Sequence, residues 1–274
     1  MFQLLAAAFF AVSAPVKVGV INSMTGPEAP IGEDITNGIK IALEDLKAKG
    51  VEVEVVWEDD TGKPQVGISA LEKLATRDNV AGVVGAYTSA VTSAVAKSAD
   101  RYKIPLINPV ASKEEITKQG YKWFFRVSAT TGDYASILLD MALSLGQPKT
   151  LAILNENTDF GTSGARSAKE FASKYEKKYG KRASYHAATA YTAMWILAQE
   201  ASKAGSDREK LRAALESGSW DTLDGPVKFA DYEGYTHQNK HQMLVEQIQN
   251  GKFFTVWPKE LATGKAIWPF PGWK

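Results

Sequence analysis

Residues 80–96 read VAGVVGAYTSAVTSAVA, and this stretch decides the fold class. The apolar run 80–85 predicts a buried strand, and the periodicity that follows predicts a helix over 89–102. Hydroxyl side chains crowd the junction between the two, at Thr88, Ser89 and Thr92. A strand that passes through a short glycine turn into a helix is the repeating unit of parallel α/β sheets.

The same rhythm extends to both sides of this stretch. Further strands are expected at 16–22, 51–58, 104–108 and 150–155, and further helices at 33–49, 65–77 and 133–145. Strands that alternate with helices of this length pair in parallel, with helices on both faces of the sheet. The sequence therefore predicts an α/β fold with a doubly wound parallel sheet.

The pattern changes after Gly161. Helices are expected over 164–179, 187–203 and 207–217, whereas strands return only at 225–230, 241–249 and 253–258. We therefore expect a first α/β lobe over 15–125, a reduced, helix-rich second lobe over 126–225, and C-terminal return strands with a tail over 226–274.

The N-terminal segment 1–14 has the pattern of a secretory signal peptide. Residues 2–12 are almost wholly apolar, and small residues follow at the expected cleavage point. No basic residue precedes the apolar run, and Pro15 would follow the cut, so a packed N-terminal strand is the alternative interpretation. Export to an extracytoplasmic compartment is the expectation that we carry forward.

Composition excludes several classes of function. The 274 residues carry a net charge of +1, and no basic stripe is present, which argues against nucleic acid or an anionic membrane as the partner. Cysteine is absent, so the sequence offers no disulfide, thiolate metal site or cysteine nucleophile.

Two predicted strand ends carry hydroxyl groups where a ligand would bind. Ligands of a doubly wound sheet lie beyond the carboxyl ends of its strands. Ser89, Ala90 and Thr92 begin the helix after one strand, and Ser112 follows the next. Unpaired N–H groups at a helix start attract a carboxylate. The competing interpretation is structural: such residues cap helices, and Ser112 with Glu115 matches a capping box.

The remaining motifs indicate neither a metal site nor a catalytic site. His237 and His241 have a metal-binding spacing but no third ligand, which favours a solvated surface. Glu58, Asp59 and Asp60 run into a turn sequence, which favours a solvated turn over a magnesium or acid–base cluster. Phosphate-loop, dinucleotide and nucleophile-elbow motifs are also missing. We expect no metal, no cofactor and no enzymatic activity.

The order of several segments resembles a known family. VKVGVINSMTGPEAPIGEDITNGIKIALEDLKAKG (16–50), VVGAYTSAVTSAVA (83–96), KIPLINPVASKEEITKQGYKWFFRVSATTGD (103–133), LAILNENTDFG (151–161) and GPVKFADYEGYT (225–236) follow one another as in periplasmic solute-binding proteins of ABC transporters, in the leucine/isoleucine/valine-binding, type I family. The resemblance implies two lobes that close about a hinge on a small polar solute. That solute would be a branched-chain or other amino acid, a short amide or urea.

The resemblance also implies partners and site residues. A periplasmic monomer would pass its solute to an ABC permease in the inner membrane. Ser89 matches the hydroxyl that bonds the ligand carboxylate. The Val110 carbonyl and the Ser112 hydroxyl and N–H, with Ala111 between them, match the segment that holds both the carboxylate and the amino group.

The second lobe departs from the family pattern. Ile31 stands where relatives often have an aromatic lid, and Phe160 stands where an aromatic of the second lobe closes over the ligand. Relatives have further strand–helix units between the segments that contain Gly161 and Phe171, and about three units of roughly 30 residues each are absent here. A natural deletion, an engineered minimal form and an error in the gene model all produce this pattern. If a charged partner of the ligand's ammonium is lost with those units, binding weakens by about 2–5 kcal/mol.

Three alternatives to a transport receptor remain open. The same fold serves as the ligand-sensing domain of a receptor or regulator. A hydrolase would use the serine at the helix start, but no motif links a histidine to Ser89. A truncated homologue with impaired binding is the third alternative.

Overall fold

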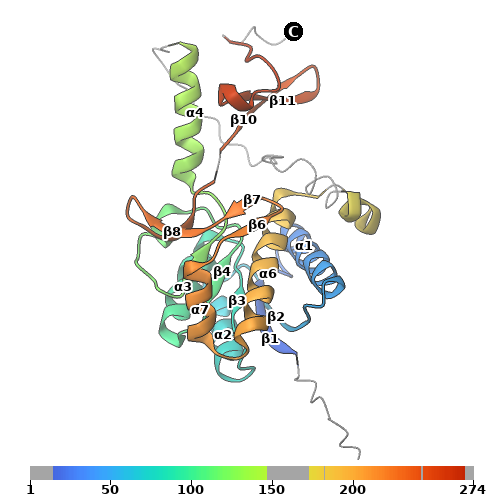
Figure 1. Cartoon of the computed structure of the whole chain (residues 1–274), viewed down its shortest axis with the longest axis vertical. Helices are drawn as coiled ribbons and strands as arrows, with labels where there is room; N and C mark the ends of the chain where they lie inside the picture. The colour runs from blue at the N-terminus through green and yellow to red at the C-terminus, as the bar shows by residue number, and fades with distance from the viewer. Residues whose placement is uncertain (1–14, 147–172, 182, 242, 269–274) are drawn as a thin grey trace, which may run out of the picture.

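The computed structural model describes residues 15–146, 173–181, 183–241 and 243–268, and its centre is a seven-stranded sheet (Figure 1). The strand order is β2-β1-β3-β4-β5-β9-β8. The strands are β1 Val16–Asn22, β2 Val53–Asp59, β3 Val83–Val84, β4 Leu106–Asn108, β5 Phe124–Arg126, β8 Phe229–Tyr232 and β9 Tyr235–Asn239. All neighbours pair in parallel except β8 with β9.

Alternate strand residues bury their side chains on opposite faces of the sheet. Val84 and Ile107 belong to one core cluster, and Val83 and Leu106 belong to the other. The helices that supply these cores are α1 Ala29–Ala48, α6 Tyr185–Ala204 and α7 Arg208–Ser217 on the first face, and α2 Pro64–Thr76 and α3 Ser89–Tyr102 on the second. Because both faces are covered, the sheet is doubly wound, which confirms the predicted fold class.

Predicted helices agree with the structure more closely than predicted strands. The helix expected over 89–102 has the bounds of α3, and α1, α2, α6 and α7 begin within four residues of their predicted starts. The pattern missed β5, β9 and the strand β6 (Trp220–Thr222), which pairs with β7 (Gly225–Val227). These strands have three to five residues, too few for alternation to be visible.

The expected division between lobes does not describe this core. Helices α6 and α7, which we expected in a second lobe over 126–225, pack on the sheet of the first lobe. Ala193 and Leu197 of α6 and Leu211 of α7 are fully buried in the same cluster as Val20 of β1. The first lobe is therefore completed by residues far beyond position 125, because strands β1 to β5 leave one sheet face open that only later helices cover.

A short helical segment, 173–179, docks on α1 through polar contacts. The hydroxyl of the fully buried Tyr175 donates to Asp34 Oδ1 at 2.9 Å. Lys174 pairs with Asp45, and Lys178 pairs with Glu44. These contacts hold the segment 173–179 against α1.

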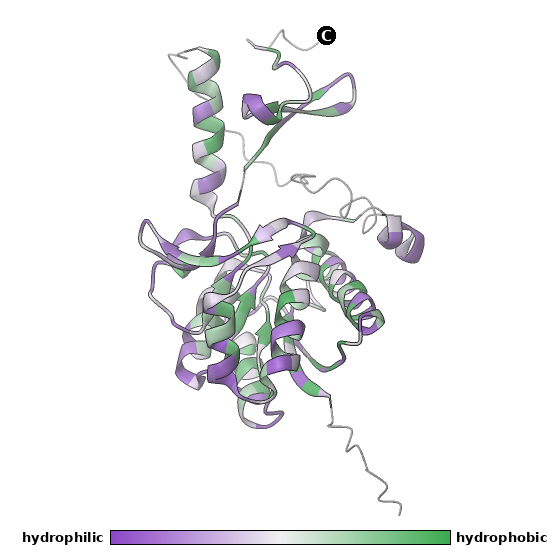
Figure 2. Cartoon of the chain, in the orientation of Figure 1, coloured by the Kyte–Doolittle hydropathy of each residue, from purple (hydrophilic) through white to green (hydrophobic). Residues whose placement is uncertain are grey.

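The remaining elements lie beyond the carboxyl-end edge of the sheet. Helix α4 (Thr131–Leu145) and the hairpin of β10 (Val245–Gln249) and β11 (Lys252–Trp257) stand apart from the main body (Figure 1). Leu138, Leu139 and Leu143 of α4 are each about half exposed, and apolar residues recur along this helix (Figure 2). Strand 150–155, segment 1–14 and most of helix 164–179 are predictions that fall outside the described residues. Among the described helices, none is both long and apolar enough to cross a membrane.

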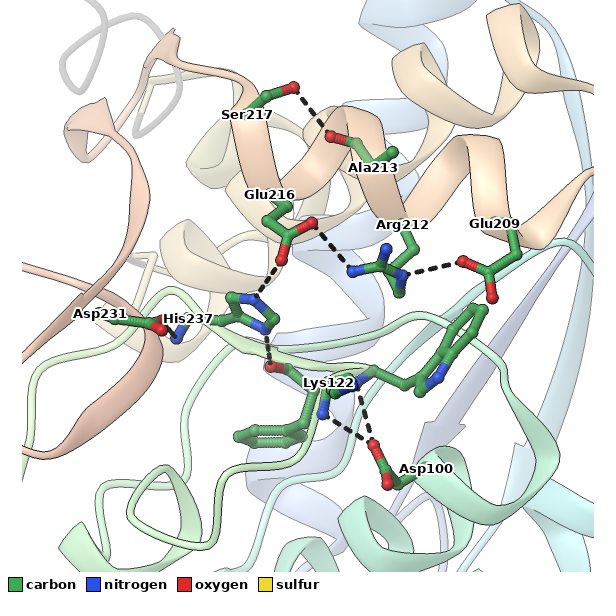
Figure 3. A network of polar contacts seen from close by, with 11 residues as sticks. Asp100, Lys122, Glu209, Arg212, Ala213, Glu216, Ser217, Asp231 and His237 are labelled. Atoms are coloured by element: carbon green, nitrogen blue, oxygen red, sulfur yellow. Dashed lines mark hydrogen bonds and ion pairs between the residues drawn. The ribbon is translucent and has the colours of Figure 1, made fainter.

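The prediction that His237 lies on a solvated surface is wrong. Its side chain is 5% exposed, and its ring stacks on Phe125 at 4.4 Å between centroids. Its two ring nitrogens lie 3.3 Å from the Phe124 carbonyl and 3.3 Å from the Glu216 carboxylate. Figure 3 shows the contact with Glu216. The segment becomes buried because β9 inserts beside β5, a pairing that its polar sequence did not indicate. In the described part of the chain, no group of three potential metal ligands is present, and His237 has a structural role.

Candidate functional site

A narrow crevice, too small in this structure to admit a water molecule, lies where strands β1, β3 and β4 end. Its wall consists of Val20, Ile21, Asn22, Ile35, Ile39, Val84, Gly85, Ala86, Tyr87 and Pro109. These residues come from the ends of three parallel strands and from the first turns of α1. The crevice therefore lies at the carboxyl-end edge, where a doubly wound sheet binds its ligands.

The loop from β3 into α3 presents free donors at this edge. Thr88 is the N-cap of α3, and its hydroxyl accepts from the Val91 N–H at 3.2 Å. Ser89 is thus the first helical residue and not the cap. Within the described chain, the N–H groups of Ser89 and Ala90 have no hydrogen-bond partner, and the Ser89 hydroxyl has none either. The start of α3 is therefore open to an anion.

Thr92 does not share this role. Its side chain is fully buried, and its hydroxyl donates to the Ala86 carbonyl at 3.2 Å. The same hydroxyl accepts from Asn108 Nδ2 at 3.3 Å. Thr92 therefore holds the loop that precedes Ser89, and its predicted contact with a ligand does not fit this geometry.

The segment after β4 supplies the second set of predicted residues. Val110 and Ala111 are buried, and Ser112 is half-buried. The Ser112 carbonyl accepts from the Thr131 N–H at 2.9 Å, whereas its own N–H and hydroxyl have no partner among the described residues. The two loops lie side by side because β3 and β4 are adjacent strands.

The predicted capping box at Ser112 is wrong. The short 3₁₀ helix η1 (Glu114–Ile116) begins later, after Lys113, and has no side-chain cap. The capping box in this region belongs to α4, where Thr130 and Asp133 bond each other's backbone N–H groups at 3.0 and 2.7 Å. The Ser112 hydroxyl is therefore not used as a helix cap.

Of the two residues predicted to cover the ligand, the structure describes only Ile31. Ile31 lies in the first turn of α1 and packs, partly buried, against the first core cluster. Phe160 lies outside the described residues. The structure therefore brings Ser89, Ala90 and Ser112 to one edge, with Ile31 on the neighbouring element.

Tyr87 is a wall residue that our sequence analysis overlooked. It is partly exposed, lines the crevice, and packs edge-on against His186 with ring centroids 5.5 Å apart. Burial, with a contribution from Glu28, raises the pKa of Tyr87, so the phenol stays protonated at neutral pH. Its position two residues before Ser89, directly after a strand end, was the available signal.

The acidic residues expected in a solvated turn lie mostly in a strand: Glu58 and Asp59 end β2, and only Asp60 follows it. Asp60 is fully buried and accepts from the Ser23 hydroxyl at 2.6 Å. Asp59 accepts from the N–H groups of Met24 and Thr61 at 2.9 and 2.8 Å. These two carboxylates shape the loop that leads from β1 to α1 along the crevice.

Asp59 makes the stability of this loop depend on pH. Burial favours its neutral form, but hydrogen bonds from Thr25, Thr61 and Met24 outweigh burial and lower the pKa of Asp59 below its ordinary value of 3.8. A lowered folded-state pKa stabilises the protein above the unfolded pKa, and this gain is lost as pH falls through the folded value.

At neutral pH we expect Asp59→Asn to lower the free energy of unfolding by about 1 kcal/mol, a modest figure because solvent screens the partly exposed carboxylate. The difference from the parent should shrink as the pH is lowered below 3.8. Urea unfolding at several pH values measures this, with Glu72→Gln on the exposed side of α2 as the charge control. A difference that stays constant with pH would contradict the assignment.

The family described as periplasmic binding protein matches residues 15–174 and 166–252. Leu/Ile/Val-binding protein homolog 3 of Brucella melitensis is 29% identical over 155 residues, 55% of this chain and 42% of that protein. The Leu/Ile/Val-binding protein BraC3 of Rhizobium johnstonii is 30% identical over 152 residues, 54% of this chain and 41% of that protein. The chain thus spans less than half the length of these curated relatives.

Solved structures share the fold. A branched-chain amino acid transporter substrate-binding protein from Streptococcus pneumoniae, in complex with isoleucine, superposes with a TM-score of 0.70 at 18% identity and covers 87% of this chain and 97% of that one. An ABC transporter substrate-binding protein from Desulfitobacterium hafniense, in complex with Leu, gives 0.72 at 14% identity, with 88% and 99% covered.

Proposed function

The chain belongs to the family of periplasmic binding proteins, and we propose that it captures an amino acid or a similar small polar solute and presents it to an ABC transporter permease. Proteins of this family bind a ligand without catalysing a reaction. We accordingly propose a periplasmic, monomeric receptor and not an enzyme.

One observation carries this proposal. Two adjacent loops present donors at the carboxyl-end edge of the sheet that have no partner among the described residues: the N–H groups of Ser89 and Ala90, the N–H of Ser112, and both serine hydroxyls. Nearby Thr88 and Thr130 already cap α3 and α4, so these serines are not needed as caps. Donors in excess of acceptors, at a helix start, suit a carboxylate.

The ligand class follows from this donor set. An α-carboxylate accepts several such bonds at once, and charged acceptors form stronger hydrogen bonds than neutral ones. The names of the relatives support branched-chain amino acids in particular. Short amides and urea are the neutral compounds that the same donors could hold.

A thermal-shift screen tests the proposed function. The purified chain is melted with amino acids, small amides, urea and simple carboxylates. A ligand present at 100 times its dissociation constant adds about 2.7 kcal/mol of stability, a shift of about 5–10 °C for a chain of this size. A cooperative melt that no compound shifts would contradict the proposal and would favour a homologue with impaired binding.

Serine substitutions locate the site within the chain. Ser89→Ala and Ser112→Ala are each expected to weaken amino-acid binding about tenfold, because each removes one hydrogen bond to a charged group. Isothermal titration measures the affinity, and unfolding in urea should change by less than about 0.5 kcal/mol.

Ser98→Ala is the matched control, since the Ser98 hydroxyl donates to the Ala94 carbonyl at 3.2 Å further along the same helix. The Ser98→Ala variant should bind the amino acid with the affinity of the parent. If Ser89→Ala and Ser112→Ala lower the melting temperature but leave affinity intact, both serines are structural and the site lies elsewhere.

A further inference from the structure

Arg126, the last residue of β5, is a fully buried cation. Its side chain makes four short contacts: Nε donates to Gln238 Oε1 at 2.5 Å, one terminal nitrogen donates to Thr117 Oγ1 at 2.6 Å, and the other donates to the carbonyls of Ala111 and Lys113 at 3.2 and 2.7 Å. An arginine in the apolar run WFFRV (123–127) is unusual for a buried strand, so its position calls for an explanation.

All four acceptors of Arg126 are neutral. In the described part of the chain no carboxylate forms an ion pair with it. Burial lowers the pKa of Arg126 to about 10, which still leaves the guanidinium charged at neutral pH. The carboxylates of Asp133 and Glu114 favour the charged form from beyond ion-pair distance. A buried charge with no carboxylate in direct contact is still costly, and nearby dipoles must help to stabilise it.

The Ala111 contact connects this charge to the proposed site. The Ala111 carbonyl and the Ser112 N–H belong to the same peptide group, so the guanidinium bonds one end of the group whose other end is an unpaired donor. A hydrogen bond to the carbonyl end polarises the peptide and makes its N–H a stronger donor. The charge thus acts along the peptide and not by direct contact.

We propose that Arg126 is a positioning residue that acts through the Ala111–Ser112 peptide to favour solutes carrying a carboxylate over their neutral amides. This inference rests on the proposed function. The selectivity for charge would then depend on a side chain that does not touch the ligand. A carboxylate bound at Ser112 would in turn stabilise the buried guanidinium electrostatically.

Leucine and leucinamide test this selectivity, since they differ only in replacement of the carboxylate by an amide. In Arg126→Gln we expect affinity for leucine to fall about tenfold, or 1.4 kcal/mol. Affinity for leucinamide should fall by less than about twofold, because a neutral acceptor gains little from a polarised donor. Isothermal titration gives both values. Equal losses for the two ligands would overturn the proposal and leave Arg126 with a purely structural role.

Thr117→Val is the matched control. It removes one partner of the guanidinium but leaves the charge and both carbonyl contacts in place. The ratio of leucine to leucinamide affinity should match that of the parent even if the protein is less stable. A ratio that falls as far as in Arg126→Gln would show that loosening the cluster, and not loss of the charge, causes the effect.

An NMR measurement decides the question without a ligand. The Ser112 amide ¹⁵N resonance should move upfield in Arg126→Lys or Arg126→Gln, whichever folds, because its peptide carbonyl loses the guanidinium bond. The Ser89 resonance, on the other loop, should stay in place. An unmoved Ser112 resonance would overturn the inference. If the parent binds neither leucine nor leucinamide, only the proposed function fails, and the resonance still reports on Arg126.

Discussion

Replacement of Gly38 by alanine is expected to lower the free energy of unfolding by about 3 kcal/mol, at the upper end of overpacking effects. Gly38 lies in α1 where this helix crosses α6, and an added Cβ would stand 2.0 Å from the Ala187 carbonyl oxygen. The obstacle is backbone, so no side-chain rotation relieves it and the two helices must separate. Because both helices belong to the first core cluster, that separation loosens the packing on one whole face of the sheet.

Thermal unfolding measures the loss, which corresponds to a fall of about 6–12 °C in Tm. Gly67→Ala is the matched control, because its Cβ would stand nearest to side-chain methyl groups, of Val91 at 2.6 Å and of Val95 at 3.0 Å, and not to backbone, so a smaller loss is expected. Both substitutions gain the same helix propensity, about 1 kcal/mol, so their difference isolates the close approach. If Gly38→Ala and Gly67→Ala are equally stable, the close approach of α1 to α6 at Gly38 is contradicted.

Asn108→Ala is the second substitution with a large expected effect, about 3 kcal/mol in the free energy of unfolding. The Asn108 side chain is fully buried, and its Nδ2 donates to the carbonyls of Ala86 and Gly85 at 2.8 and 3.2 Å and to Thr92 Oγ1 at 3.3 Å. Removal of the amide leaves these buried acceptors with fewer partners, at a cost of about 1–3 kcal/mol for an unsatisfied group, and also leaves a cavity.

This substitution should also weaken ligand binding, because Asn108 fixes the loop that carries Ser89. We expect about a tenfold loss of affinity for the amino acid identified in the screen. Thr92→Val, which keeps the side-chain volume but loses one hydroxyl, should cost only about 1 kcal/mol and weaken affinity less than Asn108→Ala, because the Asn108 bonds to the Gly85 and Ala86 carbonyls remain. Stability and affinity are measured by urea unfolding and titration. If Asn108→Ala loses stability but binds the ligand as tightly as the parent, the hydrogen bonds of Asn108 do not contribute to the binding site.

Sequence patterns were sufficient where the signal is local. The apolar period of 3.6 over 89–102 and its polar start gave the bounds of α3, because a helix satisfies its hydrogen bonds within a few residues. The strand ends with Ser89 and Ser112 were also predictable, since the order of strands and helices alone sets which loops reach the carboxyl-end edge.

Patterns failed where burial depends on distant partners. The polar residues of β9 are buried because that strand pairs with β5, more than 100 residues earlier, through Arg126 and Gln238. His237 was assigned to solvent for the same reason. Helix α6 looked like part of a second lobe, since nothing in its own sequence says which sheet face it covers.

The sequence by itself determined the alternation of strands and helices, the doubly wound class and the hydroxyl groups at two strand ends, because each depends on short-range periodicity and chain order. Only the tertiary structure decided which of those hydroxyls are free. Thr88 and Thr92 are used within the loop, whereas Ser89 and Ser112 are left as donors. That outcome depends on where other segments place their acceptors, and the buried charge of Arg126 behind the Ser112 peptide is set in the same way.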